Sequence, residues 1–132
     1  MPRYAEHAVL GSGAGVLFSL VVQDARQAAA PVAIDPVHAG VCAVAGFLGS
    51  CVPDRLEPAS RLVGPNHRGA FHSMWFLALS VKGAHYFATL KTDNEVERWI
   101  ADIAGAFCAG VSSHLIADLF TSRGLNFADK GF

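Results

Sequence analysis

Charged side chains are scarce in this chain of 132 residues. They make up 16% of the sequence, whereas hydrophobic residues make up 52%; soluble domains usually contain about 25% charged residues. Ten basic and eleven acidic side chains leave a net charge of −1, so the chain lacks the basic surface that binds an extended nucleic acid. Its apolar composition also excludes a disordered chain, and its length predicts a single domain over residues 1–132.

Paired cysteines are lacking as well. The chain has an odd number of them, none in a CxxC pair and all in apolar surroundings: Cys42, Cys51 and Cys108. This pattern excludes a disulfide framework and a cysteine-based zinc site. We expect the three thiols to fill small spaces in the core, in a protein that faces a reducing compartment.

Long uninterrupted apolar runs are few. Apolar segments cover residues 8–22, 37–52, 70–81 and 100–120, mostly shorter than or interrupted within the ~20 residues that a spanning helix needs. Basic residues flank several segments without a one-sided bias, so they predict no membrane orientation. The segments fit either buried helices of a cytoplasmic protein or membrane helices, and the low charge content favours membrane association.

Periodicity and helix-breaking residues predict an all-α fold. We expect helices over 6–22, 36–50 and 70–90, and a fourth that Asp93 caps and that begins near Asn94. Asp35 and Pro36 are typical of an N-cap followed by proline at the first helical position. Between residues 51 and 69, three prolines and two glycines predict one long ordered loop. Without strand-period alternation, the sequence predicts a four- to five-helix bundle with this loop between helices two and three.

The fourth helix carries the clearest stripe. Apolar side chains recur at steps of three and four residues and predict its core-facing side: Val96, Ile100, Ile103, Phe107 and Val111. The same stripe continues to His114 and Asp118. A buried histidine and carboxylate need partners, so they form either a hydrogen-bonded pair or part of a metal site.

Potential metal ligands occur at four places along the chain. They are His7, Asp54 with Glu57, His67 with His72, and His114 with Asp118. Imidazole and carboxylate without thiolate suit zinc, manganese, iron or nickel, and we expect one to three ions. A metal with an open position activates water for hydrolysis near neutral pH. The alternatives are that His67 and His72 cap a helix and that His7 lies on the surface.

Two further side chains have candidate catalytic roles. Arg68 lies between two of the candidate histidines and offers a planar fork for a phosphate oxygen, or else a structural salt bridge. Glu57 is expected to ligate metal or move a proton, or to pair with a nearby arginine. Ser73 is placed to cap the third helix, whereas His38 and His85 match no motif and are interpreted as structural or surface residues.

Several short motifs in a fixed order resemble one protein family. They are the histidine before a glycine-rich helix, GSCVPDRLEPAS, NHRGAFHS and SHLIADLFTSRGLNF. The set resembles the bacterial and phage family of membrane-bound, metal-dependent hydrolases, some of them under SOS-repressor control. The resemblance extends from His7 to Phe127 and implies a cytoplasmic membrane location. It also implies a metal site to which this chain contributes Asp54, His67, His72, His114 and Asp118.

The sequence differs from the usual pattern of this family in two places. The second acid of the Pro-Asp motif, Glu57, is shifted by one position, and the turn at residues 121–124 lacks the usual proline. The motifs are also similar, more distantly, to the helical zinc-dependent phospholipase C and single-strand nuclease group. That similarity implies phosphoester substrates by analogy of fold.

Two hypotheses from different classes follow. The first is a metal-dependent hydrolase that cleaves a small-molecule or lipid phosphoester through a hydroxide bound to the metal. The second is a non-enzymatic membrane or assembly protein, in which a structural metal or a polar cluster holds helices together. Homo-oligomers and a membrane are compatible with both.

Overall fold

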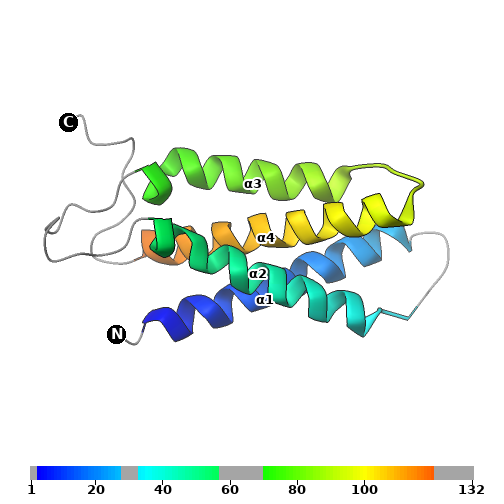
Figure 1. Cartoon of the computed structure of the whole chain (residues 1–132), viewed down its shortest axis with the longest axis horizontal. Helices are drawn as coiled ribbons and strands as arrows, with labels where there is room; N and C mark the ends of the chain where they lie inside the picture. Colours follow the sequence, from blue (N-terminus) through cyan, green and yellow to red (C-terminus); the bar gives the residue numbers. More distant parts are fainter. Residues whose placement is uncertain (1–2, 28–32, 57–69, 121–132) are drawn as a thin grey trace, which may run out of the picture.

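The computed structural model describes residues 3–27, 33–56 and 70–120. These residues form four α-helices and one 3-10 turn: α1 (Arg3–Arg26), α2 (Pro36–Leu56), η2 (Ala70–His72), α3 (Met74–Thr89) and α4 (Glu95–Leu119). Successive helices run in opposite directions, and α4 packs against the other three (Figure 1). The predicted all-α bundle is therefore confirmed.

The helix starts follow local capping chemistry. The carboxylate of Asp35 accepts the backbone N–H of Val37 at 2.8 Å, as expected for an N-cap before proline. The hydroxyl of Ser73 accepts the N–H of Phe76 at 3.2 Å and so divides the predicted helix over 70–90 into η2 and α3. The predicted cap at Asp93 is wrong, because Asn94 is the N-cap of α4.

The second helix is longer than predicted. It ends at Leu56 instead of near Ser50, so Pro53 and Asp54 lie inside a helix and not in a loop. Proline removes only one helical hydrogen bond, and here it is buried in the last two turns of α2, which packs against α4. The rest of the predicted loop, residues 57–69, lies outside the described residues.

Glycines allow three helices to approach closely. A Cβ at Gly46 of α2 would lie 2.9–3.0 Å from the backbone of Gly15 in α1, and a Cβ at Gly110 of α4 would lie 2.7–2.8 Å from the backbone of Gly46. Such distances are shorter than any ordinary contact, so a larger side chain would push the helices apart. Small residues serve the same purpose in packed membrane helices.

Large apolar side chains cover the outside of the bundle. Val9 is 71% exposed and Leu17 is 63% exposed. The predicted core stripe of α4 is wrong in its first half, because Val96, Ile100 and Ile103 lie outward while the small residues Ala101, Gly105 and Ala106 are buried. Apolar residues outside and small residues inside are typical of helices that pack within a lipid environment.

Three of the described helices are long and apolar enough to cross a membrane. They are Ala5–Arg26, Pro36–Leu56 and Glu95–Leu119. α3, with 16 residues, extends over ~24 Å at 1.5 Å per residue and is shorter than a hydrocarbon core of ~30 Å.

Candidate metal centre

Five of the predicted ligands converge at one end of the bundle. They come from four elements: His7 from α1, Asp54 from α2, His72 from η2, and His114 and Asp118 from α4. This end holds the beginnings of α1 and α3 and the ends of α2 and α4 (Figure 1). The antiparallel topology therefore joins residues that are far apart in the sequence.

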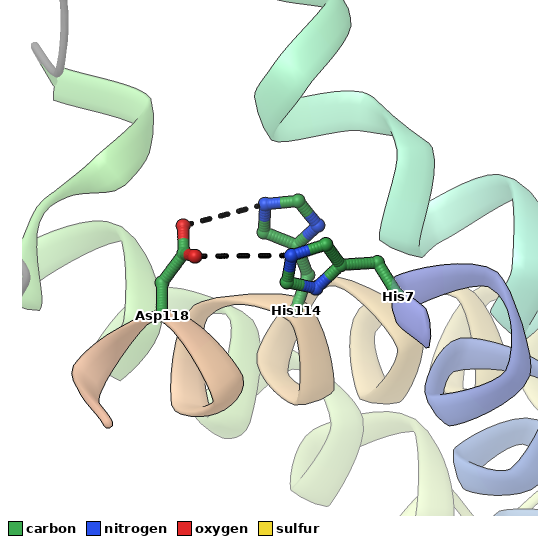
Figure 2. A group of neighbouring side chains, drawn as sticks. All are labelled: His7, His114 and Asp118. Atoms are coloured by element: carbon green, nitrogen blue, oxygen red, sulfur yellow. Dashed lines mark ion pairs between the residues drawn. The ribbon is translucent and has the colours of Figure 1, made fainter. Parts of the chain in front are cut away.

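Asp118 lies among three imidazoles. Its carboxylate oxygens are 3.8 Å from Nε2 of His7, 3.7 Å from Nε2 of His72 and 3.6 Å from Nε2 of His114. Figure 2 shows the carboxylate facing the rings of His7 and His114. These separations exceed a direct hydrogen bond but leave the oxygens and nitrogens close enough to share one ion.

Asp54 completes a second group on the α2 side. Its Oδ1 atom is 3.4 Å from Nε2 of His72 and 3.6 Å from Nε2 of His114. The structure thus has two sets of three potential ligands, and within each set the ligand atoms lie within 4.8 Å of one another. The two sets are His7, His114 and Asp118, and Asp54, His72 and His114. His114 belongs to both sets.

The imidazoles of His7 and His114 are buried with ring nitrogens that have no hydrogen-bond partner among the described residues. The rings of His7 and His114 stack with centroids 4.1 Å apart (Figure 2). Within the described part of the chain, Nδ1 of His7 and both ring nitrogens of His114 are buried and accept or donate no hydrogen bond. Because buried polar atoms without partners are costly, these nitrogens fit a centre that binds a cation.

The donor set also indicates which ions fit. Neutral imidazole and carboxylate suit zinc, manganese, iron and nickel, whereas magnesium and calcium prefer oxygen ligands alone. Three ligands around an ion leave positions open for water or substrate. Asp54 is 30% exposed and the four other side chains are at most 11% exposed, so Asp54 on the α2 side is the most accessible of the five candidate ligands.

The helical step explains part of this arrangement directly. His114 and Asp118 are four residues apart in α4, which places them one turn apart on the same face, as the sequence predicted. Asp54 reaches the centre from the last turn of α2, although the sequence placed it in a rigid turn. Glu57, His67 and Arg68 lie outside the described residues, so their roles remain predictions.

A second polar cluster lies toward the other end of α4. Arg26 of α1 donates two hydrogen bonds to the carboxylate of Asp102, at 2.5 and 2.6 Å. Nε2 of His38 is 2.9 Å from the same carboxylate, and its Nδ1 is 2.7 Å from the hydroxyl of Ser19. Gln23 donates to Ser19 at 2.8 Å. Because every side chain has a partner, this cluster connects α1, α2 and α4 without needing a ligand.

Sequence reasoning missed most of this second cluster. It interpreted His38 as structural or surface, and the structure buries this residue inside the bundle. Asp102 was not singled out, although an acid within an apolar helix is a signal of a buried partner. The partners themselves were not predictable, because Arg26 is 76 residues away in the chain.

Comparison with known proteins gives one match. A family model described as YdjM inner membrane protein matches residues 1–128, nearly the whole chain. No curated protein and no solved structure matches. The family description states a membrane location and no activity.

Proposed function

The chain belongs to the YdjM inner membrane protein family, and from the geometry of its polar centre we propose that this centre is the site of a metal-dependent hydrolase in the bacterial cytoplasmic membrane. The three membrane-capable helices agree with this location, which the sequence analysis favoured over the cytoplasm. The proposed substrate is a phosphoester, of lipid or nucleotide type, and the proposed ion is divalent, with zinc the first choice.

The observation that carries the proposal is the set of buried imidazole nitrogens without partners. A polar cluster that served only to connect helices would pair its donors and acceptors, as the cluster around Asp102 does. Nδ1 of His7 and both ring nitrogens of His114 remain without hydrogen bonds to the described residues, and Nε2 of each ring lies 3.6–3.8 Å from the carboxylate of Asp118. A bound cation supplies the missing interactions and balances the carboxylates.

In the proposed reaction, separate residues bind the ion, move a proton and stabilise developing charge. When bound, a divalent ion would supply Lewis acidity, which would polarise a phosphoryl oxygen and activate water near neutral pH. The residues that would hold the ion are His7, His72, His114, Asp54 and Asp118, and the predicted sixth ligand is His67. Glu57 is proposed to move a proton and Arg68 to stabilise the charge that develops on the phosphoryl oxygens.

The test begins with metal content. Protein purified in detergent without chelator, with zinc, manganese, iron or nickel supplied, is analysed by mass spectrometry beside the variants His114→Ala and Asp118→Ala. We expect at least one ion per chain in the natural protein, a clear loss in His114→Ala and a smaller loss in Asp118→Ala, which leaves the set on the α2 side complete. Less than one ion per chain under metal-replete conditions would refute the proposal.

Activity distinguishes this function from the alternative. A non-enzymatic membrane or assembly protein with a structural metal is supported by the close glycine packing of α1, α2 and α4 and by a family description that names no activity. Hydrolysis of a chromogenic phosphomonoester or phosphodiester that disappears with chelator and returns with added ion would exclude it. Metal binding without such hydrolysis would favour it.

A further inference from the structure

We propose that the bundle has a second binding site, for a phosphate group, at the end opposite the metal centre. The phosphate belongs either to an anionic membrane lipid or to a small soluble molecule, and binding measurements separate these two sources. The site goes beyond the proposed hydrolase and does not depend on it. Three observations carry it: the position of a cavity, the basic side chains that line it, and the partners of those side chains.

An open cavity lies where the end of α1 meets the segment between α3 and α4. Its volume is about 540 Å³, and it is at the opposite end of the bundle from the candidate metal ligands (Figure 1). Its walls include Ala25 and Arg26 of α1, Leu90 and Lys91 after α3, and Arg98 of α4. Because three separate parts of the chain form it, the cavity is a product of tertiary packing and not a feature of one helix.

Basic side chains outnumber acidic ones in this cavity. Arg26, Lys91 and Arg98 line it, and Asp93 is the single acid among the described residues of its lining. The whole chain, by contrast, has a net charge of −1 and only ten basic residues. Three of those ten in one cavity give it a positive potential, which favours an anion.

Two of these three basic side chains are available to a ligand. Arg26 donates two hydrogen bonds to Asp102, so a carboxylate already balances its charge. Within the described part of the chain, neither the guanidinium of Arg98 nor the ammonium of Lys91 forms an ion pair or a hydrogen bond. Arg98 is only partly exposed, so its guanidinium has lost water without gaining a partner in the protein. An anion in the cavity supplies that partner.

Acidic side chains lie on another side of Arg98. A smaller cavity of about 220 Å³ also borders this arginine, and Asp35, Glu95 and Asp102 line it. Carboxylates repel an anion, so the smaller cavity does not suit one. The anion is therefore expected in the larger cavity, between Arg98 and Lys91.

Guanidinium and ammonium together suit a phosphate group. Arginine offers a planar fork of N–H donors that matches two phosphate oxygens, and lysine adds a compact charge with three donors. Basic pockets between membrane helices bind lipid headgroups with the same two side chains. The cavity thus has the chemistry of a phosphate site.

The position of the cavity suits a lipid headgroup as well as a soluble phosphate. Arg26 is the last residue of α1, Lys91 follows the end of α3 by two residues, and Arg98 is the fourth residue of α4. In an inner membrane protein, such helix ends lie near the boundary between hydrocarbon and water. Exposed Ala25 and Leu90 add apolar surface beside the bases, which an acyl chain covers and inorganic phosphate does not.

The experiment measures binding to the intact chain in neutral detergent. Native mass spectrometry with dioleoyl phosphatidylglycerol tests the lipid source, and dioleoyl phosphatidylcholine, with the same acyl chains and no net charge, is its control. Isothermal titration calorimetry with inorganic phosphate and glycerol 3-phosphate tests the soluble source. A chelator is present throughout, because an ion in the metal centre would itself attract phosphate. Tighter binding of phosphatidylglycerol than of phosphatidylcholine identifies a lipid, and binding of the soluble phosphates without that preference identifies a soluble ligand.

Variants test the two bases. Arg98→Gln should weaken binding about tenfold through loss of charged hydrogen bonds, and Lys91→Gln should weaken it about fivefold. Lys82→Gln is the matched control, because it removes the same charge from an exposed lysine of α3 that does not line the cavity, and it should leave affinity unchanged. His114→Ala should also leave affinity unchanged. Arg98→Lys keeps the charge without the fork and should bind with intermediate affinity, and circular dichroism confirms that each variant is folded.

The outcomes decide the proposal whichever source supplies the phosphate. Affinity that falls in the Arg98 and Lys91 variants but not in Lys82→Gln supports the site. Binding of neither the lipid nor the soluble phosphates would overturn it, as would unchanged affinity in the folded variants or an equal loss in Lys82→Gln and Lys91→Gln. A comparable loss in His114→Ala would assign the binding to the metal centre and overturn it too. None of these results depends on hydrolysis, so the proposed function is tested separately.

Discussion

His114 is the residue whose loss should damage the metal centre most. It belongs to both sets of potential ligands, whereas His7 and Asp118 belong to one and Asp54 and His72 to the other. Substituting any of these four leaves one complete set of three ligands. His114→Ala leaves neither set complete, whichever set holds an ion.

The size of the effect follows from the number of ligands. A structural zinc site with four ligands binds with ~10–16 kcal/mol, or about 3 kcal/mol for each ligand. Loss of that amount weakens binding ~100-fold. We therefore expect a dissociation constant about 100-fold higher for His114→Ala, and a smaller increase for His7→Ala because the set on the α2 side remains.

The assay is competition with a metal indicator, supported by mass spectrometry of the bound ion. His85→Ala is the control, because this histidine is exposed on α3 outside both ligand sets and should leave affinity unchanged. Circular dichroism and gel filtration in detergent test whether His114→Ala folds, and His114→Gln serves as a second variant of closer size. Unchanged affinity in folded His114 variants would refute the assignment of ligands.

Three other predictions concern the bundle. Gly110→Val should destabilise the protein by ~1–3 kcal/mol through overpacking against α2. Gly40→Val, whose Cβ meets open space, should leave stability unchanged or raise it by under ~1 kcal/mol, because valine favours a helix more than glycine does. Thermal unfolding in detergent compares the two variants, and equal melting temperatures would contradict close packing. Arg26→Ala should cost ~1–3 kcal/mol, because it removes two hydrogen bonds from buried Asp102 while His38 still contacts this carboxylate. A loss below ~0.5 kcal/mol in the same measurement would show that the pair is dispensable. Ser73→Ala should cost ~0.5–2 kcal/mol through loss of the α3 cap, seen as a lower midpoint of denaturant unfolding; no change would mean that the cap hydrogen bond is not stabilising.

The fold was predictable where local rules decide it. The absence of strand periodicity and the capping residue Asp35 predicted an all-α chain and the start of α2. Helix ends were less predictable, because α2 continues through Pro53 to Leu56 within the packed bundle. The core stripe of α4 was misassigned in its first half, since the interpretation assumed water outside and the outer surface is apolar.

In the metal centre, too, local patterns predicted some features and tertiary packing decided the others. The step from His114 to Asp118 is set by one helical turn, so the sequence was sufficient to place both on one face. Residue type and motif also predicted that His7, Asp54 and His72 are candidate metal ligands. Their approach to His114 required antiparallel helices in the right register, which no local pattern specifies.

By itself the sequence determined the helical class, the apolar character and the residues able to bind an ion, because these depend on composition and on hydrogen bonds within a few residues. Only the tertiary structure decided which helix faces meet. Gly46 admits α1 and α4 at close range, and that contact brings Asp102 to Arg26 toward one end and five candidate ligands together at the other. Contacts between residues far apart in the chain depend on the packing of whole helices, so the scarce charges of this chain acquire their partners only in the folded bundle.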